Sequence, residues 1–181
     1  MMPRNPRVPF LVVAMAMASL PQGLLGQGRR ASAPADGWPP IEVGVHGGYE
    51  SPSTGSVLGA QVRIPLHPSG YVELVSTGDV VFLPRLKEYL SGVNLVAVSG
   101  GRRGGIYVGG GVTWRNTLYD GARATRRFPT IVAGLRSPEL FGSRLGTQLE
   151  VRWIRVDTAA KPKVMTLGVN VPLWGRGGRG R

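Results

Sequence analysis

Hydrophobic and polar residues alternate along most of the chain between Ile41 and Trp174. At the start of this region, Val43 and Val45 fall on one face of an extended strand, and Glu42 and His46 fall on the other. Side chains of a β-strand point alternately to its two faces, so each such segment has one apolar side and one polar side. The pattern predicts a protein built almost entirely from strands.

Turn residues divide this region into eight such segments, most of them about 10 to 13 residues long. Helix signals are nearly absent, and the 28 glycines argue against long helices. We expect strands near residues 41–50, 57–66, 71–80, 88–98, 104–115, 128–136, 144–156 and 163–174. The short connections predict an all-β, antiparallel up-and-down meander, and eight strands are enough to close it into a barrel.

The N-terminal residues 1–26 have the features of a cleavable signal peptide. Arg4 and Arg7 precede an apolar core from Val8 to Leu20, and a stretch of small residues follows. The core is too short to span a membrane as a helix, although a retained N-terminal anchor is the alternative. The chain is therefore predicted to be exported.

The composition of the flanking segments sets the limits of the folded domain. Residues 27–40 have the composition of a flexible linker, and residues 175–181 form a Gly/Arg-rich tail that we expect to be disordered. The β-barrel is expected to occupy residues 41–174. The chain contains no cysteine, which excludes disulfide bonds and thiolate metal sites.

The formal net charge of +12 raises the question of nucleic-acid binding. Residues 1–40 and the tail each contribute +3, so half of the excess lies outside the predicted domain. One short Gly/Arg segment on an exported chain is a weak RNA-binding signal. We therefore expect no nucleic-acid partner.

The polar faces of the predicted strands carry charged and amide side chains but little lysine. These faces contain Glu42, His46, Glu50, Gln61, Arg63, Glu73, Asn94, Tyr107, Arg115, Arg136, Gln148, Glu150, Arg152 and Asn170. A water-soluble barrel would expose this face, whereas a membrane barrel turns it into the lumen. Long strands, branched apolar faces and glycines on the polar face favour a transmembrane β-barrel whose lumen is plugged by polar, ion-paired side chains. A soluble exported β-barrel that binds a small apolar ligand is the alternative.

The third, fourth and sixth strands fit this pattern less well. Val75, Val96, Val98 and Val132 fall on the polar face, which suggests that these strands are partly misaligned in the prediction.

The orientation of a membrane barrel follows from its export and its even strand number, which place both ends of the domain on the periplasmic side. The connections after odd-numbered strands then face outward, and residues 116–127 form the longest of these predicted loops. Aromatic residues near the strand ends predict an interfacial belt. They are Tyr49, Tyr89, Trp114, Trp153 and Trp174, although Trp174 has the wrong parity to face lipid.

The last predicted strand runs from Met165 to Trp174, with alternating apolar residues and a final aromatic residue. In this strand and in the pattern from Ile41 onward, the chain resembles the small eight-stranded outer-membrane β-barrel family of Gram-negative bacteria, the OmpA/OmpX-like group. The resemblance implies an outer-membrane location, a structural or surface-interaction role in the cell envelope, and recognition by the outer-membrane assembly machinery. The tail after Trp174 departs from the family pattern, which typically ends on the aromatic residue.

Some small outer-membrane barrels modify lipid A with a histidine, a serine and a carboxylate near the rim. The histidines of this chain are His46 and His67; no serine lies near His46 on its face, and His67 falls in a turn. We therefore expect a non-enzymatic protein with no catalytic, cofactor-binding or metal site, in which His46 forms hydrogen bonds in the lumen. A lipid A-modifying enzyme is the less favoured alternative.

Basic residues gather in the connections that are predicted to face outward. They are Arg85, Lys87, Arg123, Arg126, Arg127, Lys161 and Lys163. The hypothesis is that they contact the phosphates of lipopolysaccharide. Lipopolysaccharide, outer-membrane lipid and the assembly machinery are the expected partners, and the sequence indicates no oligomeric state.

Overall fold

The computed structural model describes residues 37–83, 86–119, 122–140, 143, 145–155 and 162–174. The predicted signal peptide, most of the predicted linker and the C-terminal tail lie outside the described residues. The strands are β1 (Ile41–Ser51), β2 (Gly55–Pro65), β3 (Val72–Phe82), β4 (Lys87–Val98), β5 (Gly105–Tyr119), β6 (Ala122–Ser137), β7 (Gly146–Ile154) and β8 (Lys163–Trp174). Within the described part of the chain, no helix is long and apolar enough to cross a membrane.

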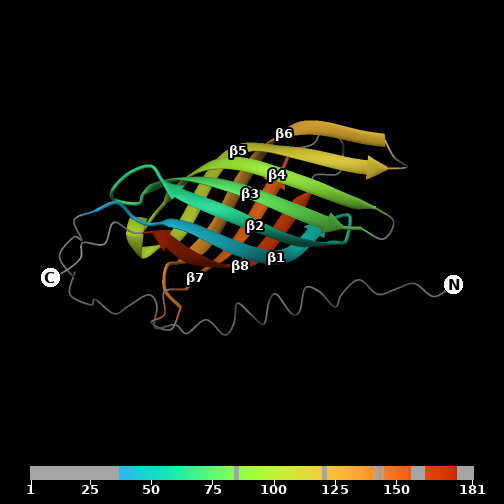
Figure 1. The fold of residues 1–181 in the computed structure, drawn as a ribbon. Coiled ribbons are helices and arrows are strands. Elements are labelled where there is room, and N and C mark those ends of the chain that lie inside the picture. Colours follow the sequence, from blue (N-terminus) through green and yellow to red (C-terminus); the bar gives the residue numbers. More distant parts are fainter. Residues whose placement is uncertain are drawn as a thin grey trace. The chain divides into compact units, whose positions relative to one another are not determined.

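The eight strands form a closed barrel (Figure 1). Each strand pairs antiparallel with the next one in the sequence, and β1 also pairs with β8. Val45 of β1, for example, lies opposite Ala60 of β2 on one side and Val169 of β8 on the other. Where every strand pairs with both of its neighbours, closure removes the free edges of the sheet and leaves only an inner and an outer face. The predicted eight-stranded antiparallel meander barrel is confirmed.

The two faces of the barrel have an inverted distribution of polarity. The arginines Arg63 and Arg152 point inward and are each 1% exposed, whereas Leu58, Ile106 and Leu167 point outward and are 60%, 63% and 60% exposed. The alternation of β4 is complete, with every second residue from Glu88 to Val98 buried. The barrel therefore has a charged interior and a hydrophobic outer wall.

The valines on the predicted polar face also lie in the interior, so the suspected misalignment of three strands is wrong. Val75, Val96, Val98 and Val132 pack with Tyr107 in a buried hydrophobic cluster. These side chains come from β3 to β6, on the same side of the lumen. The interior is therefore partly hydrophobic, and burying these groups stabilises the barrel without requiring hydrogen-bond partners.

The β5–β6 hairpin extends much farther than the sequence predicted. Residues 116–127, expected to form a long loop, continue the two strands, and pairing runs as far as Tyr119 opposite Ala122. Figure 1 shows the two strands projecting beyond their neighbours at one end of the barrel. We call this end, where β1 ends, the outer end, and the opposite end the inner end.

The lengths of the connections do not support the predicted orientation. At the inner end, residues 66–71, 99–104 and 138–145 connect the strands. At the outer end, residues 52–54, 83–86 and 120–121 are the shorter intervals between strands, and only the interval 155–162 is as long as those at the inner end. The prediction that residues 116–127 form the longest outward loop is therefore wrong, because most of this segment belongs to β5 and β6.

Candidate functional site in the barrel lumen

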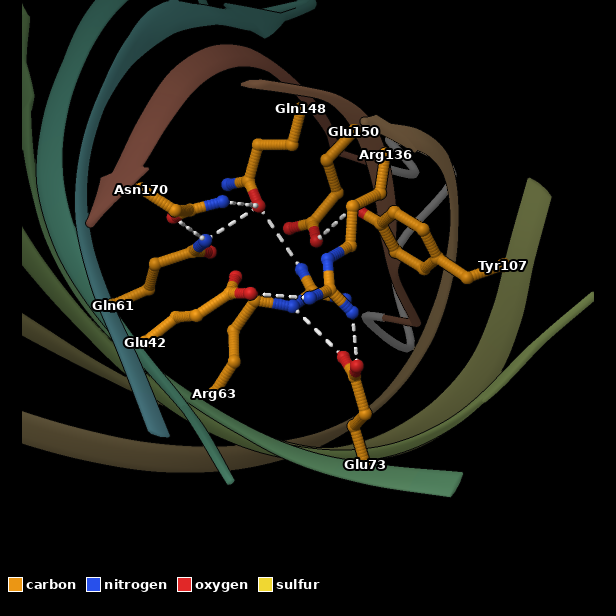
Figure 2. Close-up of polar contacts among 9 residues, drawn as sticks. All are labelled: Glu42, Gln61, Arg63, Glu73, Tyr107, Arg136, Gln148, Glu150 and Asn170. Carbon is orange, nitrogen blue, oxygen red and sulfur yellow. Dashed lines mark hydrogen bonds and ion pairs between the residues drawn. The ribbon is translucent and has the colours of Figure 1, made fainter. Parts of the chain in front are cut away.

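An ion-pair network fills the inner half of the lumen (Figure 2). Arg136 of β6 contacts the carboxylates of Glu42 and Glu73, and the Nε of Arg63 donates to Glu73 at 3.0 Å. The four side chains come from β1, β2, β3 and β6, so they cross the lumen and join opposite walls. Charged groups shielded from water must be paired in this way, because an isolated buried charge is strongly unfavourable.

Amide side chains extend the network toward β8. The Oε1 atom of Gln148 accepts hydrogen bonds from Arg63 at 3.0 Å, from Gln61 at 2.5 Å and from Asn170 at 3.3 Å. Gln61 also donates to Asn170 at 2.7 Å. Figure 2 shows these amides and the guanidinium of Arg63 pointing toward one another. One oxygen atom thus joins β2, β7 and β8.

Tyr107 connects the ion pairs of the inner half with those nearer the middle of the barrel. The guanidinium carbon of Arg63 lies 4.7 Å from the centre of its ring, and its hydroxyl donates to Glu150 at 2.7 Å. Glu150 in turn forms an ion pair with Arg152 at 2.9 Å. The carbon atoms of the ring therefore pack in the hydrophobic cluster, and its hydroxyl hydrogen-bonds to the charged network.

His46 and Asp79 form a buried pair that the sequence analysis did not find. The Nε2 atom of His46 contacts Asp79, and Arg152 pairs with the other carboxylate oxygen at 2.6 Å. Gly59 of β2 lies between His46 and Asp79 in the sheet, opposite both residues. A side chain at position 59 would overlap both partners, so the glycine opens the space through which they meet.

A prediction follows from the contact between Gly134 and Tyr107. A Cβ atom at position 134 would lie 2.5 Å from Cζ of the Tyr107 ring. We expect Gly134→Val to displace the ring from Glu150 and to lower the free energy of unfolding by about 1–3 kcal/mol. Urea unfolding in lipid vesicles measures this loss. Gly78→Ala is the matched control, because its Cβ would meet nothing within 4 Å and unfolding should be nearly unchanged.

A second charged cluster lies near the outer end of the lumen. Arg115 pairs with Glu50 at 3.1 Å and also contacts Glu88. Ser53 donates to Glu50 at 2.5 Å, and Thr117 donates to Glu88 at 3.0 Å. A cluster of buried hydrophobic residues also lies within the lumen; it consists of Val57, Val81, Leu90, Ile154 and Val164. Hydrophobic and ion-paired side chains together therefore fill the interior.

The structure places all fourteen predicted lumen residues inside the barrel, and all of them except half-buried Arg115 are buried. Among the described residues, the buried polar residues that the predicted lumen set did not include are Thr77, Asp79, Glu88, Thr113, Thr130 and Thr166. The signal for Asp79 was present, because it shares strand parity with Glu73. The same holds for Glu88, which shares strand parity with Asn94.

Four of the five predicted belt aromatics have described side chains. Tyr89, Trp114 and Trp153 are exposed on the outer wall near the outer end, and Tyr49 is half-buried there. The side chain of Trp174 lies outside what the structure describes. Phe82 at the outer end, and Trp38 and Tyr71 at the inner end, are exposed aromatics that the prediction did not include.

The predicted outer basic residues are only partly described. Lys87, Arg126, Arg127 and Lys163 are exposed at the outer end of the barrel. Arg85 and Lys161 lie outside the described residues, and for Arg123 only the backbone, in β6, is described. Arg126 and Arg127 belong to the β5–β6 hairpin instead of to a loop.

The fold is similar to that of two solved bacterial barrels. No protein-family model matches the sequence, and no curated protein matches it either. The N-terminal β-barrel domain of Pseudomonas aeruginosa OprF is 15% identical with a TM-score of 0.56; the match covers 74% of this chain and 97% of that domain. Neisserial surface protein A is 9% identical with a TM-score of 0.53; the match covers 74% of this chain and 96% of that chain. Together with the closed sheet and the inverted polarity, these likenesses show that the chain has the fold of the small eight-stranded outer-membrane barrels.

Proposed function

We propose that this protein spans the outer membrane as a plugged, non-enzymatic barrel with a structural or surface-interaction role in the envelope. The observation that carries the proposal is the inverted polarity of the wall. Leucine, isoleucine and valine side chains are exposed around the barrel, while arginine and glutamate side chains are buried inside it. Lipid is the solvent in which this distribution is stable, because the outer face contacts hydrocarbon and the strands satisfy one another's backbone groups.

The soluble ligand-binding alternative fits the structure less well. Such a barrel would place an apolar cavity inside and polar residues outside. Here the interior contains the ion pairs of Arg63, Arg136 and Arg152, and the outer wall exposes many large hydrophobic residues. Continuous apolar surface of this extent indicates a lipid or protein contact.

A non-enzymatic role is supported by the surroundings of His46. Its ring is almost completely buried, and its Nε2 atom is bound to Asp79 in the middle of the lumen. A lipid substrate would have to displace the packed network to reach it. We therefore propose that His46 stabilises the barrel.

Reconstitution into planar lipid bilayers tests whether the barrel is plugged. We expect the folded protein to migrate differently on gels before and after boiling, and to show no large steady conductance in the bilayer. The physical reason is that side chains from opposite walls meet in the lumen, as Arg136 does with Glu42 and Glu73. Steady conductance at the level of a porin would contradict the proposal, as would recovery of the unboiled protein as a soluble species.

We further propose that the outer basic rim contacts the phosphates of lipopolysaccharide. Lys87 begins β4 beside the exposed ring of Phe82, and Lys163 begins β8 opposite Trp153, so both cations lie at the level of the aromatic belt. Lipid phosphates are found at this depth, and cations there gain favourable electrostatic energy.

The double variant Lys87→Glu with Lys163→Glu tests this contact. We expect weaker binding of lipopolysaccharide to the detergent-solubilised protein, with the difference shrinking as salt increases, because salt screens exposed charges. Arg103→Glu, an exposed site at the inner end, is the matched control. Equal binding by the wild type and the double variant at low salt would refute the contact.

A further inference from the structure

Among the described residues, the projecting part of β6 has one edge, on the β7 side, along which no strand pairs, and we call it the open edge. On one side of the hairpin, β4 pairs with β5 as far as Glu88 opposite Thr117. On the other side, β7 pairs with β6 only from Thr130 opposite Ile154 onward. Over residues 122–129, the described strand that pairs with β6 is therefore β5 alone.

The direction of the backbone groups on this edge follows from one hydrogen bond. The N–H of Arg155 donates to the carbonyl of Pro129 at 2.9 Å, so the polar groups of residue 129 face the β7 side. Backbone groups of successive residues alternate sides in an antiparallel strand. Residues 127, 125 and 123 therefore direct their N–H and C=O groups to the open edge, and Pro129, which lacks an N–H, marks the point where the ladder with β7 stops.

The open edge is cationic on both of its faces. Arg126 lies opposite Arg115 on the lumen-side face, and Arg127 lies opposite Trp114 on the outer face. Arg115 is compensated by Glu50 and Glu88, whereas neither Arg126 nor Arg127 has an ion-pair partner among the described residues. Pairing with the same edge of a second copy would bring these like charges together, which disfavours self-association.

We propose that the β6 edge from Arg123 to Arg127 docks an extended, acidic segment of another protein as an added strand. Main-chain hydrogen bonds to an open sheet edge supply affinity in this mode, and side chains that alternate between the two faces supply specificity. Acidic residues on both faces of the added strand pair with Arg126 and Arg127. The proposal rests on the proposed function, since only a barrel inserted with this hairpin outward presents the edge to other proteins.

The expected position of the hairpin supports this role. The strands continue about five residues past Trp114 of the aromatic belt, which corresponds to roughly 16 Å along a strand at about 3.3 Å per residue. This reach takes the edge beyond the depth at which the belt meets the lipid. The segment is therefore accessible to a macromolecule in the aqueous phase.

The test uses the full chain folded in detergent micelles and a fluorescein-labelled twelve-residue peptide in which pairs of consecutive glutamates, one for each face of the added strand, are separated by valine and threonine. A second peptide of the same sequence carries N-methyl groups at alternate residues, which remove backbone donors and leave the charge intact. We expect the first peptide to bind and the second to bind at least about tenfold more weakly, because a strand cannot be added without its donors.

Two variants separate the backbone contribution from the charge. Thr125→Pro removes an N–H on the open edge and preserves both arginines, and Arg126→Gln with Arg127→Gln removes the charge and preserves the edge. We expect each to weaken binding about tenfold, while Arg103→Gln at the inner end leaves binding unchanged. Heat-modifiable gel mobility establishes that each variant is folded.

The inference is overturned if folded wild type fails to bind the peptide, or if N-methylation and Thr125→Pro leave binding unchanged while loss of the arginines abolishes it. The second result would mean that the edge attracts anions by charge alone, as lipopolysaccharide phosphates would require. The comparison of the two peptides uses the wild-type protein alone. It therefore tests strand addition even if the Thr125→Pro protein does not fold. If the folded barrel does not bind the peptide, the proposal that the β6 edge docks a strand is refuted. The proposed membrane function would not be affected by that result.

Discussion

Replacing Arg152 by methionine is expected to lower the free energy of unfolding by about 3–5 kcal/mol, since it leaves buried carboxylates without their cation. Arg152 is 1% exposed and forms ion pairs with Asp79 at 2.6 Å and with Glu150 at 2.9 Å. It also donates to Thr77 at 3.2 Å. Methionine fills much of the same space but offers neither charge nor donors. Urea unfolding of the protein in phospholipid vesicles, followed by gel mobility without boiling, measures the loss.

Two further variants show whether the loss comes from the uncompensated charge. Arg126→Met removes an exposed arginine and is expected to change stability by no more than about 0.5 kcal/mol. Adding Asp79→Asn to Arg152→Met removes one of the unpaired carboxylates and should recover part of the lost stability. A loss as small for Arg152→Met as for Arg126→Met would mean that the lumen network contributes little to the fold.

Replacing Leu167 by arginine is expected to cost about 2–4 kcal/mol of folding free energy in a lipid bilayer. Leu167 lies in the middle of β8 on the outer wall, opposite Gly47 of β1 and Leu149 of β7. If the wall contacts hydrocarbon, a guanidinium at this depth must be desolvated or must draw water and headgroups inward. On a soluble barrel, the same substitution would place a charge in water and change little.

The depth dependence of this cost provides its control. Leu173→Arg places the same charge on the same face of β8 near the inner end, where the cost is expected to be about 0–1 kcal/mol. Both variants are compared in the same vesicles by urea unfolding. Equal effects at the two positions would indicate that the outer wall does not cross a bilayer, and would favour the soluble alternative.

Alternation along the sequence was enough to assign the two faces of most strands. In β8, Thr166 is buried and Leu167 is exposed, as their parity predicted. The assignment succeeded because a closed sheet has only two faces, so one correctly placed residue fixes the others of its strand. Parity placed even Val75 and Val132 correctly on the inner face, although their hydrophobic side chains had suggested that their strands were misaligned.

Strand ends were predicted less well than strand faces. Residues 116–127 contain three arginines and four other polar residues and no clear apolar stripe, which is typical of an exposed loop. In the structure, the two sides of this segment pair with each other, as Thr117 does with Ala124. Backbone pairing across the hairpin extends the strands there, and a prediction that depended on a pattern of hydrophobic residues did not detect this pairing.

Alternation along the chain was sufficient to establish a meander of eight two-faced strands and the side chains that share a face. The folded barrel was needed to establish which polar residues meet. Glu42 reaches Arg136 across 94 positions of sequence, and His46 reaches Asp79 through the space left by Gly59. These contacts depend on how the register between neighbouring strands accumulates around the closed barrel, and on where a missing side chain leaves room. Period-two alternation describes each strand separately. It therefore contains no information on the register between strands or on where a glycine leaves room.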